Sequence, residues 1–97
     1  MPIYFLSYHA LPKEKNGVEV GGAYINCWID ATNIKIAKSI ATKNIEESSW
    51  QIDELEEGYV ISEKDYKNNP EGFESYKQAL LDKEVYVFHT YPAEDKK

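Results

Sequence analysis

The sequence contains no arginine, only one cysteine and no long apolar run. Each of these features excludes some classes of function. Arginine binds phosphates and carboxylates through two parallel hydrogen bonds, so its absence argues against binding of nucleotides or nucleic acid. The formal net charge of −6 argues in the same direction, because phosphate backbones and anionic membranes attract clusters of basic residues. We therefore expect neither nucleic acid nor a membrane as a partner.

The lone cysteine, Cys27, can form no disulfide within the chain, so the cysteine content indicates no oxidising compartment. The first residues lack the basic and apolar segments of a signal peptide. No stretch approaches the length of about 20 apolar residues that crossing a bilayer requires. We expect a soluble, cytoplasmic protein that forms one domain over residues 1–97, with a frayed charged tail over 93–97.

Apolar and turn-forming residues divide the chain into alternating strands and helices. Strands are predicted over residues 3–11, 18–30, 50–55, 59–61 and 84–91. The first two form an antiparallel hairpin with a long loop, and the Gly21-Gly22 pair marks a bulge or a close backbone approach. The Glu57-Gly58 dipeptide is predicted to be a turn that separates the third strand from the fourth.

Two helices are predicted from capping residues and from the spacing of apolar side chains. The first carries an apolar stripe from Ile34 to Ile45, and Asp30 or Thr32 caps its N-terminus. A variant capping box, Ser62 to Asp65, predicts a short helical turn around residue 66. The second helix starts with Asn69 as N-cap and proline at the first helical position.

From residue 23 onward this order is strand, helix, strand, short strand, helix, strand. It is the element order of a ferredoxin-like sandwich, preceded by an additional N-terminal strand. The first strand of that fold is central and has both neighbours taken, so either the fold is a variant or residues 59–61 form no true strand. We therefore expect an α+β fold, a variant of the ferredoxin-like sandwich with one mainly antiparallel sheet and two helices on one face.

Two short runs resemble segments of small bacterial proteins of unknown function. They are Gly-Gly-Ala-Tyr-Ile-Asn-Cys-Trp at 21–28 and Val-Phe-His-Thr-Tyr-Pro at 87–92. The resemblance implies no activity and assigns no site residue.

Aromatic side chains dominate one predicted face of the sheet. If the aliphatic faces of the strands meet the helices, the other side presents Tyr24, Trp28, Tyr86 and Phe88. A half-solvated sheet face is normally more polar, so something is expected to cover this one. Three hypotheses remain open: self-association as a homodimer, a binding surface for a ligand or partner peptide, and coverage by the loop over 12–22.

Candidate groups for chemistry are few. Cys27 and His89 can lie on one face, as a Cys–His pair requires, but a small cysteine among aliphatic residues is typical of a core. With His9 they are the only soft metal ligands, and their spacing predicts no metal site. No glycine-rich phosphate loop precedes a helix, so we expect no nucleotide cofactor. The acidic residues between 53 and 57 are interpreted as a solvated sheet edge.

Three functions follow from these observations. The first is a non-enzymatic binding or regulatory module that forms a homodimer through its sheet. The second is a small enzyme or ligand-binding protein with a site near His89 and Cys27. The third is an acidic inhibitor or immunity-type protein that competes for a basic partner surface through residues 53–57.

Overall fold

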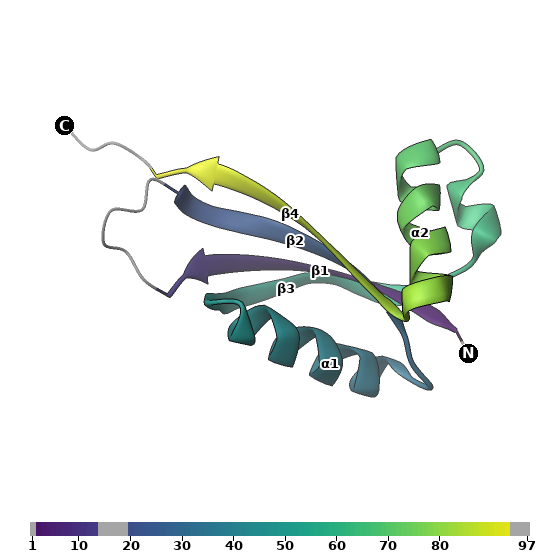
Figure 1. Ribbon diagram of the computed structural model, residues 1–97, viewed down its shortest axis with the longest axis horizontal. Coiled ribbons are helices and arrows are strands. Elements are labelled where there is room, and N and C mark those ends of the chain that lie inside the picture. The colour runs from purple at the N-terminus through teal and green to yellow at the C-terminus, as the bar shows by residue number, and fades with distance from the viewer. Residues whose placement is uncertain (1, 14–19, 94–97) are drawn as a thin grey trace.

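Four strands form a single antiparallel sheet flanked by two α-helices (Figure 1). The computed structural model describes residues 2–13 and 20–93. In chain order the elements are β1 (Ile3–Pro12), β2 (Val20–Asp30), α1 (Ile34–Glu47), β3 (Trp50–Ile61), the 3₁₀-helix η1 (Glu63–Tyr66), α2 (Pro70–Asp82) and β4 (Glu84–Pro92). The strand order is β3-β1-β2-β4, and all neighbouring strands are antiparallel. The predicted α+β class is confirmed.

The predicted hairpin forms the centre of the sheet. β1 pairs with β2 from Ile3 opposite Asp30 to Ala10 opposite Ala23. The expected bulge is present, because the register between β2 and β4 shifts between Val20 and Gly22. Much of the predicted covering loop, residues 14–19, lies outside the described residues.

α1 packs against the face of the sheet that carries the aliphatic side chains of β1 and β2, which we call the α1 face. Ala37 and Ala41 are fully buried there, and their small side chains let the helix lie close to the strands. The helix is capped by Asn33, whose side-chain oxygen accepts a hydrogen bond of 2.9 Å from the backbone N–H of Ile36. The caps predicted at Asp30 and Thr32 are wrong, because the strand β2 continues to residue 30 and the helix starts later.

β3 is one continuous strand, and the turn predicted at Glu57-Gly58 is wrong. Gly58 does not reverse the chain, and its missing side chain makes room for neighbouring core side chains. A Cβ atom there would lie 2.9 Å from Cδ2 of Leu6, so a larger residue would require the buried Leu6 side chain to shift. Because residues 50–61 form one strand and the sheet order is β3-β1-β2-β4, the ferredoxin-like topology is not confirmed.

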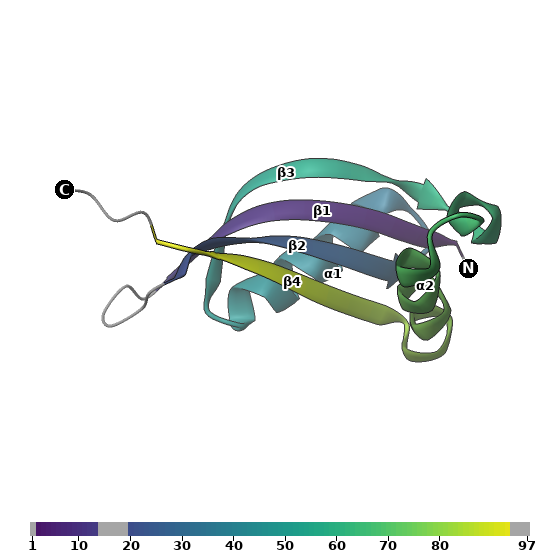
Figure 2. The same cartoon turned by 90° about the horizontal axis from the view of Figure 1, so that it is seen from above.

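α2 lies on the opposite side of the sheet from α1, which corrects the prediction of two helices on one face (Figure 2). Ala79 of α2 packs on Ile3 and Trp28, whose side chains project away from α1. The physical reason is that this end of the second sheet face is itself apolar and needs a cover. We call this second side the α2 face.

The start signals predicted for η1 and α2 are confirmed. The Asp65 carboxylate accepts a hydrogen bond of 2.7 Å from the backbone N–H of Ser62. The Asn69 side chain accepts one of 3.1 Å from the backbone N–H of Gly72, and Pro70 is the first helical residue. Of the predicted frayed tail, residues 94–97 lie outside the described residues. Among the residues described, no helix has the length and apolar character needed to cross a membrane.

Candidate functional site

The residues predicted to share an aromatic face are divided between the two faces of the sheet. Directly opposed residues of an antiparallel pair project to the same side, and Tyr86 lies opposite Cys27. Tyr86 and Phe88 therefore lie on the α1 face, whereas Tyr24 and Trp28 lie on the α2 face. The prediction of one shared face is wrong. Alternation shows which residues of one strand share a side, but it does not show how two strands are aligned.

Cys27 belongs to the core beneath α1. Its side chain is fully buried, and burial raises the pKa of the thiol to about 12. His9 and His89 both lie opposite Tyr24 in the sheet register, so their rings project from the α2 face. A Cys–His pair is therefore not formed in the described structure, and the predicted common face of Cys27 and His89 is wrong.

Three rows of side chains cross the α2 face of the sheet. The aromatic row contains Tyr59, Phe5, Trp28 and Val85; the polar row contains Glu57, Ser7, Asn26 and Val87; and the histidine row contains Glu54, His9, Tyr24 and His89. Ser7 and Asn26 are short, and they lie between rows of large rings. Asn26 lines a depression beside the aromatic row, at the end of the face that α2 covers.

This depression is a hollow of about 320 Å³ between the sheet and α2, at the small end of the range of ligand-binding pockets. Its lining is Phe5, Asn26, Trp28, Glu57, Tyr59, Tyr66, Asn69, Glu71, Gly72, Ser75, Val87 and His89. The sheet supplies the floor from all four strands, and η1 with the first turns of α2 supplies one wall. We refer to it as the hollow.

The aromatic side chains of the hollow are held in place by one another. The ring centroids of Phe5 and Trp28 are 5.2 Å apart in an edge-to-face arrangement, and those of Phe5 and Tyr59 are 5.5 Å apart. The Trp28 indole donates a hydrogen bond of 2.7 Å to the Tyr66 hydroxyl. A Cβ at Gly72 would lie 2.5 Å from the Tyr66 ring, so this glycine lets α2 close against η1. The hollow is therefore largely preformed.

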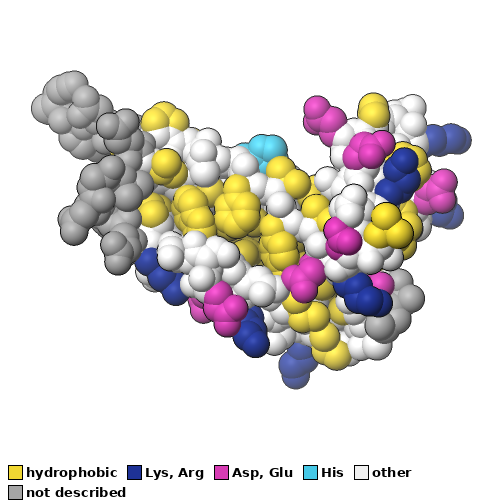
Figure 3. All heavy atoms as spheres, viewed as in Figure 1, with side chains coloured by type: hydrophobic (Ala, Val, Ile, Leu, Met, Phe, Trp, Pro, Cys, Tyr) yellow, Lys and Arg dark blue, Asp and Glu magenta, His cyan; other side chains and the backbone are white. Residues whose placement is uncertain are grey.

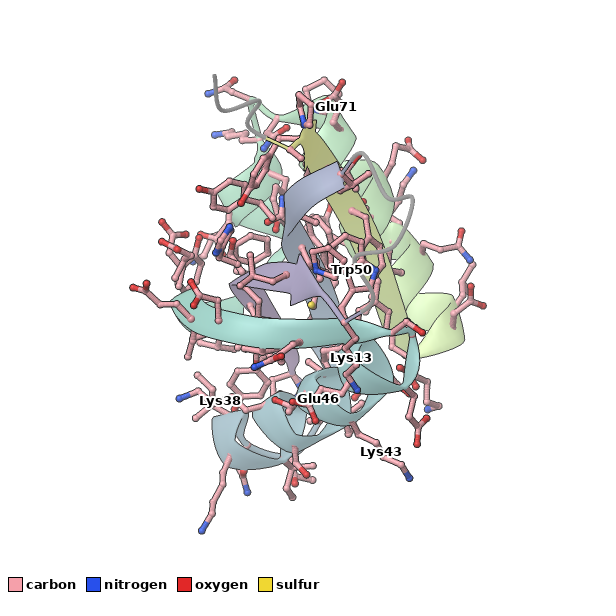
Figure 4. The ribbon with its side chains drawn as sticks, turned by 90° about the vertical axis from the view of Figure 1, so that its left-hand side faces the viewer. Lys13, Lys38, Lys43, Glu46, Trp50 and Glu71 are labelled. Atoms are coloured by element: carbon pink, nitrogen blue, oxygen red, sulfur yellow. The ribbon has the colours of Figure 1, made fainter. Side chains whose placement is uncertain are left out.

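The charge of the hollow is negative. Its charged lining side chains are both carboxylates, Glu57 from β3 and Glu71 from the first turn of α2. Figure 4 labels Glu71. Burial raises the pKa of the Tyr59 hydroxyl, and the nearby charges of Glu57 and Asp65 raise it further. Burial is the main cause of this pKa shift, and the Glu57 and Asp65 carboxylates add to it.

Beside the hollow, three strands are joined by a chain of hydrogen bonds through His9. Its Nδ1 lies 3.0 Å from the Asp53 carboxylate of β3, and its Nε2 lies 2.5 Å from the Tyr91 hydroxyl of β4. A neutral ring with the proton on Nδ1 satisfies both bonds, because it donates to the carboxylate and accepts from the hydroxyl. Tyr91 also stacks on His9, with ring centroids 5.8 Å apart.

Gly22 lets Tyr91 cross β2 to reach His9. A Cβ at residue 22 would collide with the Tyr91 hydroxyl and lie 2.7 Å from the ring carbon Cζ. The residue is buried beneath that ring. Sequence reasoning did not connect these residues, because the contact between Tyr91 and His9 spans 82 positions.

Of the predicted site residues, Trp28 and His89 line the hollow and Tyr24 lies next to it in the histidine row. The lining residues that sequence reasoning did not select include Phe5, Tyr59 and Glu71. Strand alternation could have placed Tyr59 on the same face as Glu57. The turn wrongly predicted at Glu57-Gly58 divided β3 and prevented that inference.

In residues 2–13 and 20–93, no three His, Cys, Asp or Glu side chains gather as metal ligands do. Comparison of the chain with protein-family models, with curated proteins and with solved structures gives no match.

Proposed function

We propose that the protein is a non-enzymatic binding module whose hollow takes a positively charged side chain, lysine or arginine, from a partner protein. The observation that carries this proposal is the lining, in which two carboxylates stand among four aromatic rings, those of Phe5, Trp28, Tyr59 and Tyr66. Ring faces attract cations by about 0.5–2 kcal/mol, and carboxylates add direct ion pairing.

The charge distribution around the hollow supports a basic partner. Among the described residues no lysine lines the hollow, and Asp53 and Glu54 continue the negative charge along β3. A basic segment that crosses the α2 face would meet these groups in succession. Such a surface attracts a basic partner from a distance and accelerates association at low salt. This proposal unites the binding module and the acidic inhibitor that the sequence suggested.

Titration of the Trp28 indole N–H resonance by NMR tests the proposal directly, because that side chain forms the floor. We expect N-acetyl-arginine amide and tetramethylammonium to shift the resonance with dissociation constants of about a millimolar, typical of a single weak contact. Acetate serves as the anionic control and should leave it unchanged. A short peptide with several arginine and lysine residues should bind at least about tenfold more tightly, and less so as salt rises.

Matched variants distinguish binding by the lining carboxylates from attraction by the overall negative charge of the protein. Glu57→Gln removes a lining carboxylate and should weaken arginine-amide binding about three- to tenfold. Glu56→Gln makes the same charge change on the same strand, outside the lining, and should leave binding intact. Equal losses in both variants, or a shift produced by acetate, would refute the proposal. Equal affinity for N-acetyl-arginine amide and for the basic peptide would indicate that the ligand is a small cationic molecule and not a protein.

A further inference from the structure

The two edges of the sheet differ in how they are protected against pairing with another strand. Edge strands expose unpaired backbone groups, and proteins block them with charges and bulges. β3 has both protections. Asp53, Glu54, Glu56 and Glu57 lie along it, and its register with β1 shifts twice, between Ser7 and Tyr8 and between His9 and Ala10.

β4 has neither protection over most of its length. From Val85 to Tyr91 it contains no aspartate, glutamate or lysine. Its register with β2 is regular from Glu84 to Tyr91, and the single shift lies at the end of the strand. Among the described residues, β2 is its only paired neighbour. In the part of the chain that the structure describes, β4 therefore presents an unpaired edge with a regular register and no charged side chain from Val85 to Tyr91.

An apolar patch adjoins this edge on the α1 face. Phe88 is 39% exposed, and its ring centroid lies 6.0 Å from that of Trp50. Tyr86 lies two residues before Phe88 on the same face. α1 packs mainly over β3, β2 and β1. It reaches this patch through Asn44, which donates a hydrogen bond of 2.8 Å to the Tyr86 hydroxyl, so Phe88 is the exposed part of the patch. Hydrophobic side chains gather between β4 and α1 (Figure 3).

We propose that β4 pairs antiparallel with β4 of a second copy of the chain, about a twofold axis near Phe88, the middle residue of the strand. The pairing joins two sheets into one of eight strands, four from each copy. It extends the patch of Phe88 and Tyr86 across the axis. This inference is independent of the proposed ligand of the hollow.

Two features favour a second copy over a flexible peptide as the occupant. A second β4 is already extended and held by its own sheet, whereas a disordered peptide loses about 1–2 kcal/mol per residue when it is ordered. The charges also permit self-pairing. The carboxylates of residues 53–57 lie on the opposite edge, and Glu84 at the start of β4 would face Pro92 of the second copy.

Charge substitution at the centre of the interface provides the test. By sedimentation velocity we expect the wild-type protein to be a dimer at about 100 µM, and Phe88→Lys and Phe88→Glu each to be monomeric. Like charges directly opposite each other on paired strands are repulsive. Val60→Lys adds the same charge to an exposed apolar position on β3 and should remain dimeric.

Mixing the two Phe88 variants tests the twofold arrangement itself. If Phe88 faces its own copy, an equimolar mixture of the Lys and Glu variants should restore the dimer, because each strand then meets an opposite charge. Circular dichroism of each variant confirms that the fold persists. A monomeric wild-type protein, a dimer that survives Phe88→Lys, or a mixture that remains monomeric would each overturn the inference.

Discussion

Removal of the Tyr91 hydroxyl tests the hydrogen-bond chain that joins three strands across the α2 face. In Tyr91→Phe the ring that stacks on His9 is kept, and only the bond of 2.5 Å to Nε2 is lost. The His9 side chain is 15% exposed, so water can replace the lost hydroxyl only in part. Leaving a partly buried acceptor without its partner costs about 1–2 kcal/mol.

A loss of that size is measurable by urea unfolding followed through tryptophan fluorescence. For a domain of this length, about 1 kcal/mol lowers the melting temperature by about 4–8 °C. The urea midpoint should fall with an unchanged slope, which shows that stability has changed without a change in the surface exposed on unfolding. Tyr24→Phe is the control, since it removes a hydroxyl from the neighbouring exposed ring, 47% exposed, and should change stability by less than about 0.5 kcal/mol.

A double-mutant cycle then assigns the loss to the bond between Tyr91 and His9. His9→Phe keeps an aromatic ring at the position and removes both nitrogens, so it also loses the exposed pairing with Asp53, 48% exposed. The coupling energy between His9→Phe and Tyr91→Phe should be about 1 kcal/mol. Additive effects of the two substitutions, within about 0.3 kcal/mol, would refute the hydrogen bond as a source of stability.

Three further predictions concern single residues whose contacts are described above. Cys27, with its pKa raised to about 12, should react slowly with a thiol reagent at pH 8 in the native state and rapidly after unfolding, and rapid native labelling would contradict its burial. Gly22→Ala should cost about 1–3 kcal/mol in thermal unfolding because its Cβ displaces the Tyr91 ring, and an unchanged melting temperature would show that the ring is free to move. Asn69→Ala should cost about 1 kcal/mol by the same assay, because the backbone N–H of Gly72 loses its acceptor, whereas Asn69→Asp should retain most of the stability.

Local sequence signals predicted the elements of the fold well and their arrangement poorly. Asn69-Pro70 and the Ser62–Asp65 box marked helix starts because capping depends on residues three positions apart. Gly58 was misread as part of a turn, since glycine suits both a chain reversal and a close approach. Only the position of Leu6, 52 residues away, shows that the second explanation holds.

The candidate site was harder to predict, because it is defined by the alignment of strands. The aromatic content predicted one aromatic face, but Phe88 and Trp28 face opposite ways. One end of the second face is covered by α2, which none of the three hypotheses named. The hollow itself brings together residues of all four strands, η1 and α2. No local pattern in the sequence predicts that arrangement.

The alternation of β4 links the two proposals. Phe88 and Tyr86 project to the α1 face, whereas Val87 and His89 project into the hollow. A twofold axis perpendicular to the sheet preserves its faces, so pairing through β4 places both hollows on the same side of the joined sheet. A partner with two basic segments could then occupy both hollows, and its second contact would form at high effective concentration. The monomeric Phe88→Lys variant should therefore bind a single arginine side chain as the wild-type protein does, and lose only the additional affinity for a divalent basic partner.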